Sequence, residues 1–488
     1  MTTRLGRDSG MYAYVGNHLL HGQTPYVTAW EQKPPGIFFV NAVGLWLGKG
    51  TRWGIFLMEL VFLLGAAAFG FYALKRSFGR YPAILASLLW LVGLSFVLEG
   101  GNLTEEYCLL FSFLSLYLFG LAIRRPDSPW VHALLGVVFG CSFMFRPNNT
   151  GVQVSIILTE LVLLARNQWP RKAIKGLIAT GIGFLLPVLA VSLYFVTRNA
   201  FRAFLDAAFL YNFSYGNQPQ ILGAFLSGIS NLGFAVGVGL VGVWIAVGRM
   251  PTQIRNRNID PFVLWICIDF VVEILFSGVS GLGYPHYFIS WLPWVAFAGA
   301  LLFSQLPAPA AQWSQRFAVL APLAAIVLLA LMFWNTLTVY GKTFAGIATD
   351  PSQIQRSEPL PTYVNEHTQP GDTVLVWGGD AGVNFLAGRD APTAHFQYAI
   401  LFPSRITDGI GLQFYQDIVS RPPKLILDGS GGDTGGQIVP LSTDNPVGWA
   451  AAHQVPVLPY MAEFFAFFHS HYTLKTSVAG VPIYVLRP

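Results

Sequence analysis

Residues 53–74 read WGIFLMELVFLLGAAAFGFYAL, and this stretch decides the class of fold. Its one charged residue is Glu59, and Lys75 and Arg76 follow directly after it. A helix of about 20 apolar residues spans the hydrocarbon core of a bilayer, which is about 30 Å thick. The stretch is long enough for this, so the sequence predicts a transmembrane helix over residues 53–74.

Further apolar stretches repeat this pattern as far as residue 338. They lie at 82–98, 104–123, 130–145, 150–165, 173–197, 224–248, 261–279, 286–304 and 317–338. Together with the first stretch they predict a polytopic α-helical membrane protein with about 10 transmembrane helices. The stretches at 130–145 and 150–165 are short, so we expect them to pack at an angle or to be shielded by their neighbours.

The composition of the whole chain agrees with a membrane protein. Of 488 residues, 53% are hydrophobic and only 11% are Asp, Glu, Lys or Arg, against about 25% in soluble proteins. The mean hydropathy is +0.52. So few charges cannot cover a water-soluble protein of this size, which argues against soluble enzymes and nucleic-acid-binding folds. Cys108, Cys141 and Cys267 lie in apolar runs without paired spacing, so neither disulfides nor a zinc site are expected.

The positive residues predict the orientation of the spans. Lys and Arg gather on the cytoplasmic side of short loops. Alternate loops carry most of them, namely Lys75, Arg76, Arg80, Arg124, Arg125, Arg166, Arg171, Lys172, Lys175, Arg249, Arg255, Arg257 and Arg316. The intervening loops hold only Arg146, Arg198 and Arg202. Because the number of predicted spans is even, both ends of the chain are expected on the side of the membrane away from the cytoplasm. The membrane itself is expected to be a plasma membrane of bacterial type. The net charge of +5 then follows from topology, so we expect membrane lipids but no nucleic acid as partners.

The chain divides into three zones by composition. Residues 1–52 are expected to form an external loop with short interfacial helices, residues 53–338 the transmembrane helical bundle, and residues 339–488 a small extracytoplasmic α/β domain. The last zone has strand-like runs at 373–377, 424–428 and 482–486, with helical stretches at 352–366 and 408–420. Glycine-rich segments at 378–380 and 429–433 follow two of these strands. They are interpreted either as ordinary turns or as segments that contact phosphate or sugar.

The first residues raise a question about the start of the bundle. An external zone that begins at Met1 and carries Arg4 and Arg7 has no apolar stretch before it to support its export. The hypothesis that follows is that an N-terminal transmembrane helix is missing from this chain.

Polar residues concentrate on the predicted external side, where they mark a candidate site. The densest group is Arg7-Asp8-Ser9-Gly10, Tyr12, Tyr14, His18, His21-Gly22-Gln23, Pro25-Tyr26 and Trp30-Glu31-Gln32-Lys33-Pro34-Pro35-Gly36. Smaller groups lie at 102–107, 146–149, 198–220 and 281–287. Because all these groups face one way, we expect the protein to work at its outer face.

These motifs carry a family resemblance. The order Arg-Asp-Ser-Gly, Tyr-x-Tyr-x-Gly, His-Gly-x-x-Pro-Tyr and Trp-Glu-x-Lys-Pro-Pro-Gly, followed by a Thr-Glu pair that opens a helix, resembles glycosyltransferase family 39. This family of GT-C membrane enzymes includes relatives of protein O-mannosyltransferases and of the lipid A aminoarabinose transferase. The Gly-Tyr-Pro-His-Tyr-Phe segment near residue 286 is similar to a late motif of bacterial members. The resemblance implies an inverting transfer of sugar from a polyprenyl-phosphate donor to an acceptor hydroxyl of a lipid, glycan or protein.

The resemblance also implies roles for individual residues. Asp8 matches the catalytic base, which takes the proton of the acceptor hydroxyl, although Asp8 is equally suited to cap a helix. Lys33 matches the lysine that contacts the donor phosphate; its alternative is a lysine that extends to the membrane interface. Arg7 is a second phosphate-binding candidate, or it pairs with lipid headgroups. Glu105, the second catalytic candidate, matches an acid that lines the active-site cavity, whereas its plain interpretation is a charge that complements a helix N-terminus.

His286 and Glu31 are the remaining site candidates. His286 is expected to contact the donor phosphate, or to be hydrogen-bonded within an aromatic belt. Glu31 and His286 are also the two candidate ligands of a divalent metal, although one Glu and one His make an incomplete site. No other cofactor is expected.

Two further features are interpreted without a catalytic role. Asp269 and Glu273 lie one helical turn apart inside a span, so both are expected to point into the bundle and to make structural polar contacts. The segment 198–216 mixes aromatic residues with arginines and is expected to cover the site, to receive the polyprenyl chain, or to lie on the membrane surface. Two rival functions stay open, a transporter or lipid flippase with an external binding domain and an inactive scaffold relative.

Overall fold

The structure is a computed structural model, and the residues it describes fall into two compact units. It describes residues 5–126, 128–214, 220–279, 281–306, 358–396, 407–431, 438–455, 457 and 460–488. One unit comprises residues 59–193 and 216–338, and we call it the helical unit. The other comprises residues 1–58, 194–215 and 339–488, and we call it the mixed unit. Each unit is described by itself.

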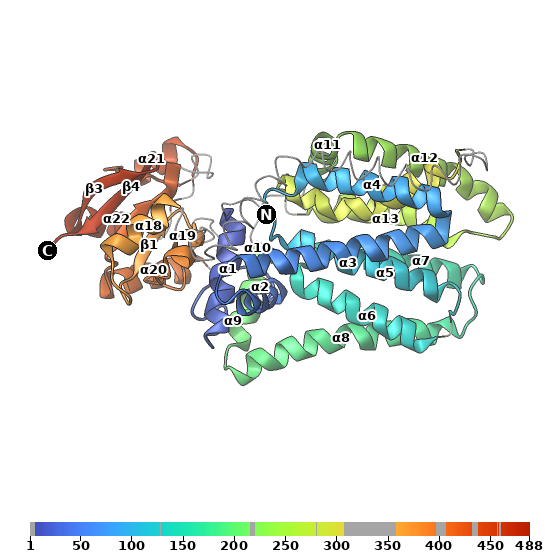
Figure 1. Ribbon diagram of the computed structural model, residues 1–488, viewed down its shortest axis with the longest axis horizontal. Helices are drawn as coiled ribbons and strands as arrows, with labels where there is room; N and C mark the ends of the chain where they lie inside the picture. The colour runs from blue at the N-terminus through green and yellow to red at the C-terminus, as the bar shows by residue number, and fades with distance from the viewer. Residues whose placement is uncertain are drawn as a thin grey trace. The chain divides into compact units, whose positions relative to one another are not determined.

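The described residues contain seven helices that are long and apolar enough to cross a membrane. These are α3 (Trp53–Phe78), α4 (Arg80–Val97), α5 (Thr104–Ala122), α8 (Ala173–Thr197), α12 (Phe234–Arg255), α13 (Pro261–Gly278), and η3 (Pro285–Trp291) with α14 (Leu292–Phe303). Figure 1 shows α3, α4, α5 and α13 with their long axes in roughly the same direction in the helical unit. The prediction of a polytopic helical membrane protein is confirmed.

The two short predicted spans form the short apolar helices α6 (Pro129–Phe145) and α7 (Gly151–Ala165), joined by the 3-10 turn η1 (Pro147–Asn149). The prediction of one span over 224–248 is wrong. The structure has α11 (Ile221–Leu232) and α12 there, with Gly233 between them at a φ of 50°. Glycine adopts such positive φ values at little cost, so the chain breaks its helix at this residue. The predicted span 317–338 lies outside the described residues.

Large aromatic side chains fill the core of the helical unit. Trp90, Trp265, Trp291 and Trp294 are fully buried among the helices, where α14 packs against α4 and α12, and α7 packs against α13. In contrast, α8 exposes a row of leucines, among them Leu186 at 58% and Leu193 at 62%. Apolar side chains that point away from the core of a membrane bundle are suited to lipid.

The N-terminal part of the mixed unit consists of short helices. Helix α1 (Arg7–Leu20) packs against α2 (Gly36–Leu47). The segment after α8 adds α9 (Phe201–Leu205), the π-turn η2 (Asp206–Leu210) and α10 (Tyr211–Ser214). Its aromatic side chains join the N-terminal segment: Trp30 meets Tyr211 edge to face at 4.9 Å between ring centroids. Aromatic pairs of this geometry stabilise beyond their buried area.

The C-terminal part of the mixed unit is built on a four-stranded sheet. Strands β1 (Val374–Trp377), β2 (Leu425–Asp428), β3 (Tyr472–Val478) and β4 (Val481–Leu486) lie in the order β1-β2-β4-β3, and only β1 and β2 are parallel. The helices are α18 (Pro359–His367), α19 (Ala381–Ala387), α20 (Thr407–Ser420), η5 (Gly429–Gly431), α21 (Pro446–Ala452) and α22 (Met461–His471). The three predicted strands are present, and so are the predicted helices as far as the structure describes them.

Strand β3 is the element that the sequence did not indicate. It forms a hairpin with β4 through Ala479 and Gly480, whose φ values are 50° and 82°. Two consecutive residues with positive φ are typical of the tight turn that suits strand twist. Because β3 lies at the sheet edge and exposes most of its residues, it lacks the apolar alternation of a half-buried strand.

Two glycines allow α1 to lie directly on α19. A Cβ on Gly10 would lie 2.7 Å from both Cα and N of Gly382. We expect Gly10→Ala to destabilise the mixed unit by about 1–3 kcal/mol, because backbone atoms cannot yield to an added methyl group. Thermal unfolding in detergent measures this. Gly409→Ala is the matched control, since a Cβ on Gly409 meets nothing within 4 Å. Equal midpoints for the two variants would contradict the prediction.

Candidate active site

Asp8 lies in the first turn of α1, in the mixed unit. The N-cap of this helix is Gly6, which makes no side-chain cap, so the alternative that Asp8 caps the helix is wrong. The Tyr12 hydroxyl donates to Oδ2 of Asp8 at 3.5 Å, a long hydrogen bond one turn along. The carboxylate is therefore placed by the helix, in its first turn.

The loop that carries Lys33 is fixed by hydrogen bonds to its backbone. Oε1 of Glu31 accepts from the backbone N–H of Gln32 at 2.9 Å and of Lys33 at 3.2 Å. The Tyr26 hydroxyl donates to the Lys33 carbonyl at 2.8 Å, and Asn212 donates to the Gln32 carbonyl at 2.8 Å. The backbone at Lys33 is thus held in place, while its ammonium has no hydrogen-bond or ion-pair partner among the described residues of this unit.

Tyr26 itself is strained. Its φ is 69°, although it is a bulky residue, and its side chain is buried. Its ring packs against Phe38, Phe195 and Phe204, with centroids 5.4 to 5.9 Å away. Strain of this kind persists only where the surroundings over-determine the conformation, which is common at functional sites. Here it directs the tyrosine hydroxyl at the carbonyl of Lys33.

Glu31 connects Asp8 and Lys33 electrostatically. Its carboxyl is buried, and burial is the main reason that its pKa rises from 4.5 to about 7. The positive charge of Lys33 opposes this rise in the pKa, and the negative charge of Asp8 adds to it. The three side chains therefore belong to one electrostatic cluster. Two of them, Asp8 and Lys33, are residues to which the resemblance assigns a role in the reaction.

The raised pKa of Glu31 predicts a pH dependence of stability. Between pH 4.5 and about 7 the folded protein keeps a proton on Glu31 that the unfolded chain has lost. Stability therefore falls as pH rises through this window, by at most about 3 kcal/mol, and levels off above it. As pH rises, the midpoint temperature of thermal unfolding should fall more for the wild type than for Glu31→Gln. Parallel curves from pH 4.5 to 8 would show that the burial of Glu31 has no such effect.

Arg7 lies at a cavity of about 290 Å³ in the mixed unit. The cavity is also lined by Gly378 and Gly429, which follow the parallel strands β1 and β2, and by Asp380 at the start of α19. Gly378 and Gly429 of the glycine-rich segments therefore line the same cavity as Arg7.

The helical unit holds the other predicted site residues in a second cluster. Glu105 lies in the first turn of α5, is 2% exposed, and forms an ion pair with Arg146. Nε2 of His286 lies 3.8 Å from Oε1 of Glu105, and its Nδ1 pairs with Glu99. The Arg146 guanidinium also lies 4.1 Å above the ring of Tyr287. Glu105 and His286 are thus brought together by tertiary structure.

Several members of this second cluster had no predicted role. Glu99 pairs with His286 and Arg146 pairs with Glu105, and the buried Glu59 accepts from the backbone N–H of Asn102. Residues 99–102 all have positive φ values, which turns the chain sharply between α4 and α5. The sequence signal for this was the run Glu99-Gly100-Gly101-Asn102, because Gly and Asn tolerate that conformation. The pairing of Arg146 with Glu105 had no local signal.

Asp269 and Glu273 are buried in α13, as predicted from their spacing.

The candidate metal ligands fit a metal poorly. Glu31 already accepts two backbone N–H groups, and the ring nitrogens of His286 face Glu99 and Glu105. Within the described ranges, no three His, Cys, Asp or Glu side chains gather as a metal site would require.

Comparison with known proteins identifies the class of fold. The family model described as dolichyl-phosphate-mannose-protein mannosyltransferase matches residues 32–215. The solved structure of ArnT from Cupriavidus metallidurans in the apo state has a TM-score of 0.58 at 14% identity, covering 99% of this chain and 94% of that one. The same protein bound to undecaprenyl phosphate has a TM-score of 0.52 at 16% identity, covering 79% and 81%. No curated protein sequence matches. The family match over residues 32–215 and the shared fold support the resemblance to glycosyltransferase family 39, a family of GT-C glycosyltransferases.

Proposed function

We propose that the chain transfers a sugar from a polyprenyl-phosphate donor to an acceptor hydroxyl at the outer face of a bacterial-type membrane, with inversion at the anomeric carbon. The acceptor is a lipid, a glycan or a protein. The observation that carries the proposal is the cluster of Asp8, Glu31 and Lys33, which combines a carboxylate with a cation on a fixed loop. A structural relative that binds undecaprenyl phosphate supports the class of donor.

Asp8 is the general base in this proposal. An acceptor hydroxyl attacks weakly until its proton is removed, so a carboxylate within hydrogen-bond reach accelerates the step. The acceptor oxygen forms a bond to the anomeric carbon while its proton passes to Asp8. The bond from that carbon to the phosphate oxygen breaks at the same time, and the electron pair stays on the polyprenyl phosphate.

Lys33 stabilises the charge that this leaving phosphate gains. A fixed cation is effective because it needs no rearrangement during the reaction. Glu31 contributes by holding the loop, since its Oε1 accepts the backbone N–H groups of Gln32 and Lys33. Arg7 keeps its proposed place as a second contact to phosphate.

Glu105 and His286, which belong to the helical unit, are proposed to keep the roles that the resemblance implies, namely an acid that lines the active-site cavity and a contact to the donor phosphate. Glu105 is paired with Arg146, so we assign it to the wall of the cavity and leave the removal of the proton to Asp8. Nδ1 of His286 pairs with Glu99, whereas its Nε2 lies 3.8 Å from Oε1 of Glu105, too far for a hydrogen bond, so we assign Nε2 to the contact with the donor phosphate. No step is assigned to a divalent metal, because the ligands available at Glu31 and His286 already have other partners.

The test is turnover of a lipid-linked sugar by the purified full-length chain in nanodiscs. Radiolabelled undecaprenyl-phosphate mannose, glucose and aminoarabinose serve as the donor panel, with a bacterial membrane extract as acceptor. The proposal expects release of undecaprenyl phosphate and transfer of label from one of the donors. A transporter or flippase would move an intact donor across the bilayer without cleaving it, and a scaffold would do neither. Either result would overturn the proposal.

A further inference from the structure

One short segment of the C-terminal part of the mixed unit contacts both pieces of the N-terminal part that carry the reactive groups. This segment, residues 390–396, follows α19, and we call it the bridging segment. It meets α1, which carries Asp8, and the loop that leads to Glu31 and Lys33. Each contact joins residues more than 350 positions apart along the chain.

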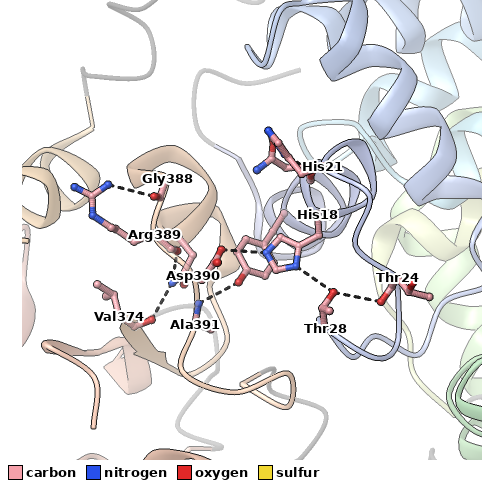
Figure 2. A network of polar contacts seen from close by, with 12 residues as sticks. His18, His21, Thr24, Thr28, Val374, Gly388, Arg389, Asp390 and Ala391 are labelled. Carbon is pink, nitrogen blue, oxygen red and sulfur yellow. Dashed lines mark hydrogen bonds and ion pairs between the residues drawn. The ribbon is translucent and has the colours of Figure 1, made fainter. Parts of the chain in front are cut away.

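Helix α1 is held by two polar contacts. Nε2 of His18 lies 3.2 Å from Oδ1 of Asp390, and its Nδ1 lies 3.4 Å from the hydroxyl of Thr28. The backbone N–H of Ala391 donates to the Tyr14 hydroxyl at 3.0 Å. Figure 2 shows the His18 ring between Asp390 on one side and Thr28 on the other. His18 and Tyr14 are both buried, whereas the side chain of Asp390 is 64% exposed, so these contacts are shielded from water only on the side of α1.

The loop is held by the far end of the same segment. The backbone N–H of Trp30 donates to the Ala394 carbonyl at 2.9 Å, directly before Glu31. The Trp30 ring packs near His395 at 6.4 Å, and the Tyr14 ring meets Phe396 edge to face at 5.2 Å. Ring contacts at His395 and Phe396 thus reinforce the polar contacts at the C-terminal end of the bridging segment.

We propose that the bridging segment is a positioning element for the reaction, and that Asp390 and His18 are positioning residues that act through α1 and the loop. The inference rests on the proposed function, because the groups held in place are its base and its phosphate-binding lysine. Displacement of a reacting group by about 1 Å can slow an enzyme by roughly 10²-fold. A contact that fixes α1 and the loop to one rigid segment prevents such displacement between Asp8 and Lys33.

Two alanine variants and two matched controls test this in the full-length chain. Asp390→Ala and His18→Ala each remove the contact. Asp372→Ala removes another carboxylate of the same part, which accepts from the Gln369 N–H, and His367→Ala removes a histidine that bonds the Tyr363 carbonyl of its own helix. Asp390→Asn keeps an oxygen that accepts from His18 and serves as the rescue. We expect the alanine variants at 390 and 18 to lower kcat by about tenfold or more with little change in KM.

Hydrogen–deuterium exchange of residues 7–36 gives a readout that needs no donor. It should be faster in Asp390→Ala and His18→Ala than in the two controls, and close to wild type in Asp390→Asn. Faster exchange without turnover of any donor by the wild type would remove the proposed function but leave the positioning role. Turnover and exchange equal to wild type in Asp390→Ala would overturn the inference, and so would an equal loss in Asp390→Asn.

Discussion

Asp8→Asn should lower the rate of sugar transfer by about 10²–10⁴-fold, the range that general-base catalysis contributes. Asparagine matches aspartate in size and cannot accept the proton of the acceptor hydroxyl. The fold should survive, because Asp8 is not the cap of α1. The loss of an acid near the helix N-terminus costs only about 0.3–1 kcal/mol. Initial rates of undecaprenyl-phosphate release, together with thermal unfolding in detergent, measure both effects.

Asp206→Asn is the matched control for Asp8. Asp206 lies in the same unit and pairs with the exposed Arg202 on its own helix. Its loss should leave transfer unchanged. Full activity of Asp8→Asn would remove Asp8 as the base, and inactivity of both variants would point to damage of the unit instead.

Lys33→Gln should lower kcat by about 10²–10³-fold, the usual cost of removing one group that stabilises charge in the transition state. The effect should fall on kcat more than on KM, because the phosphate gains charge as the glycosidic bond breaks. Lys33→Arg should recover part of the rate, since it keeps the charge but changes its shape. Steady-state kinetics with the donor that the wild type accepts will measure this.

Lys49→Gln is the control for Lys33. Lys49 is an exposed lysine beyond the end of α2 and has no assigned role. A wild-type kcat in Lys33→Gln would show that the lysine only extends to the membrane interface, which was its alternative interpretation. The control should retain the wild-type kcat in either case.

The sequence predicted the fold wherever a local rule was sufficient. Spans such as 53–74 and 173–197 follow from length and apolar composition, because the thickness of the bilayer sets both. The same rule failed at Gly233, where one residue with positive φ divides an apolar run into α11 and α12. It also gave no indication of β3, an edge strand whose exposed polar residues resemble a loop.

The residues of the candidate site could be predicted from the sequence, but most of their interactions could not. Asp8, Lys33, Glu105 and His286 were found from motifs, because each carries a chemistry that a short pattern can indicate. The raised pKa of Glu31 depends on the burial of its carboxyl, and a short sequence motif does not predict burial. The ion pair of Arg146 with Glu105 and that of Glu99 with His286 depend on which helices become neighbours.

The sequence by itself determined the membrane class of this protein and the residue types at its candidate site. Both depend on side-chain chemistry that is fixed once the residue is chosen. Only the tertiary structure decided how those residues are held. Asp390 and His18 are 372 positions apart, and their contact exists because packing of α1 on α19 brings them together. Long-range contacts of this kind are set by the whole fold, so no local pattern predicts them.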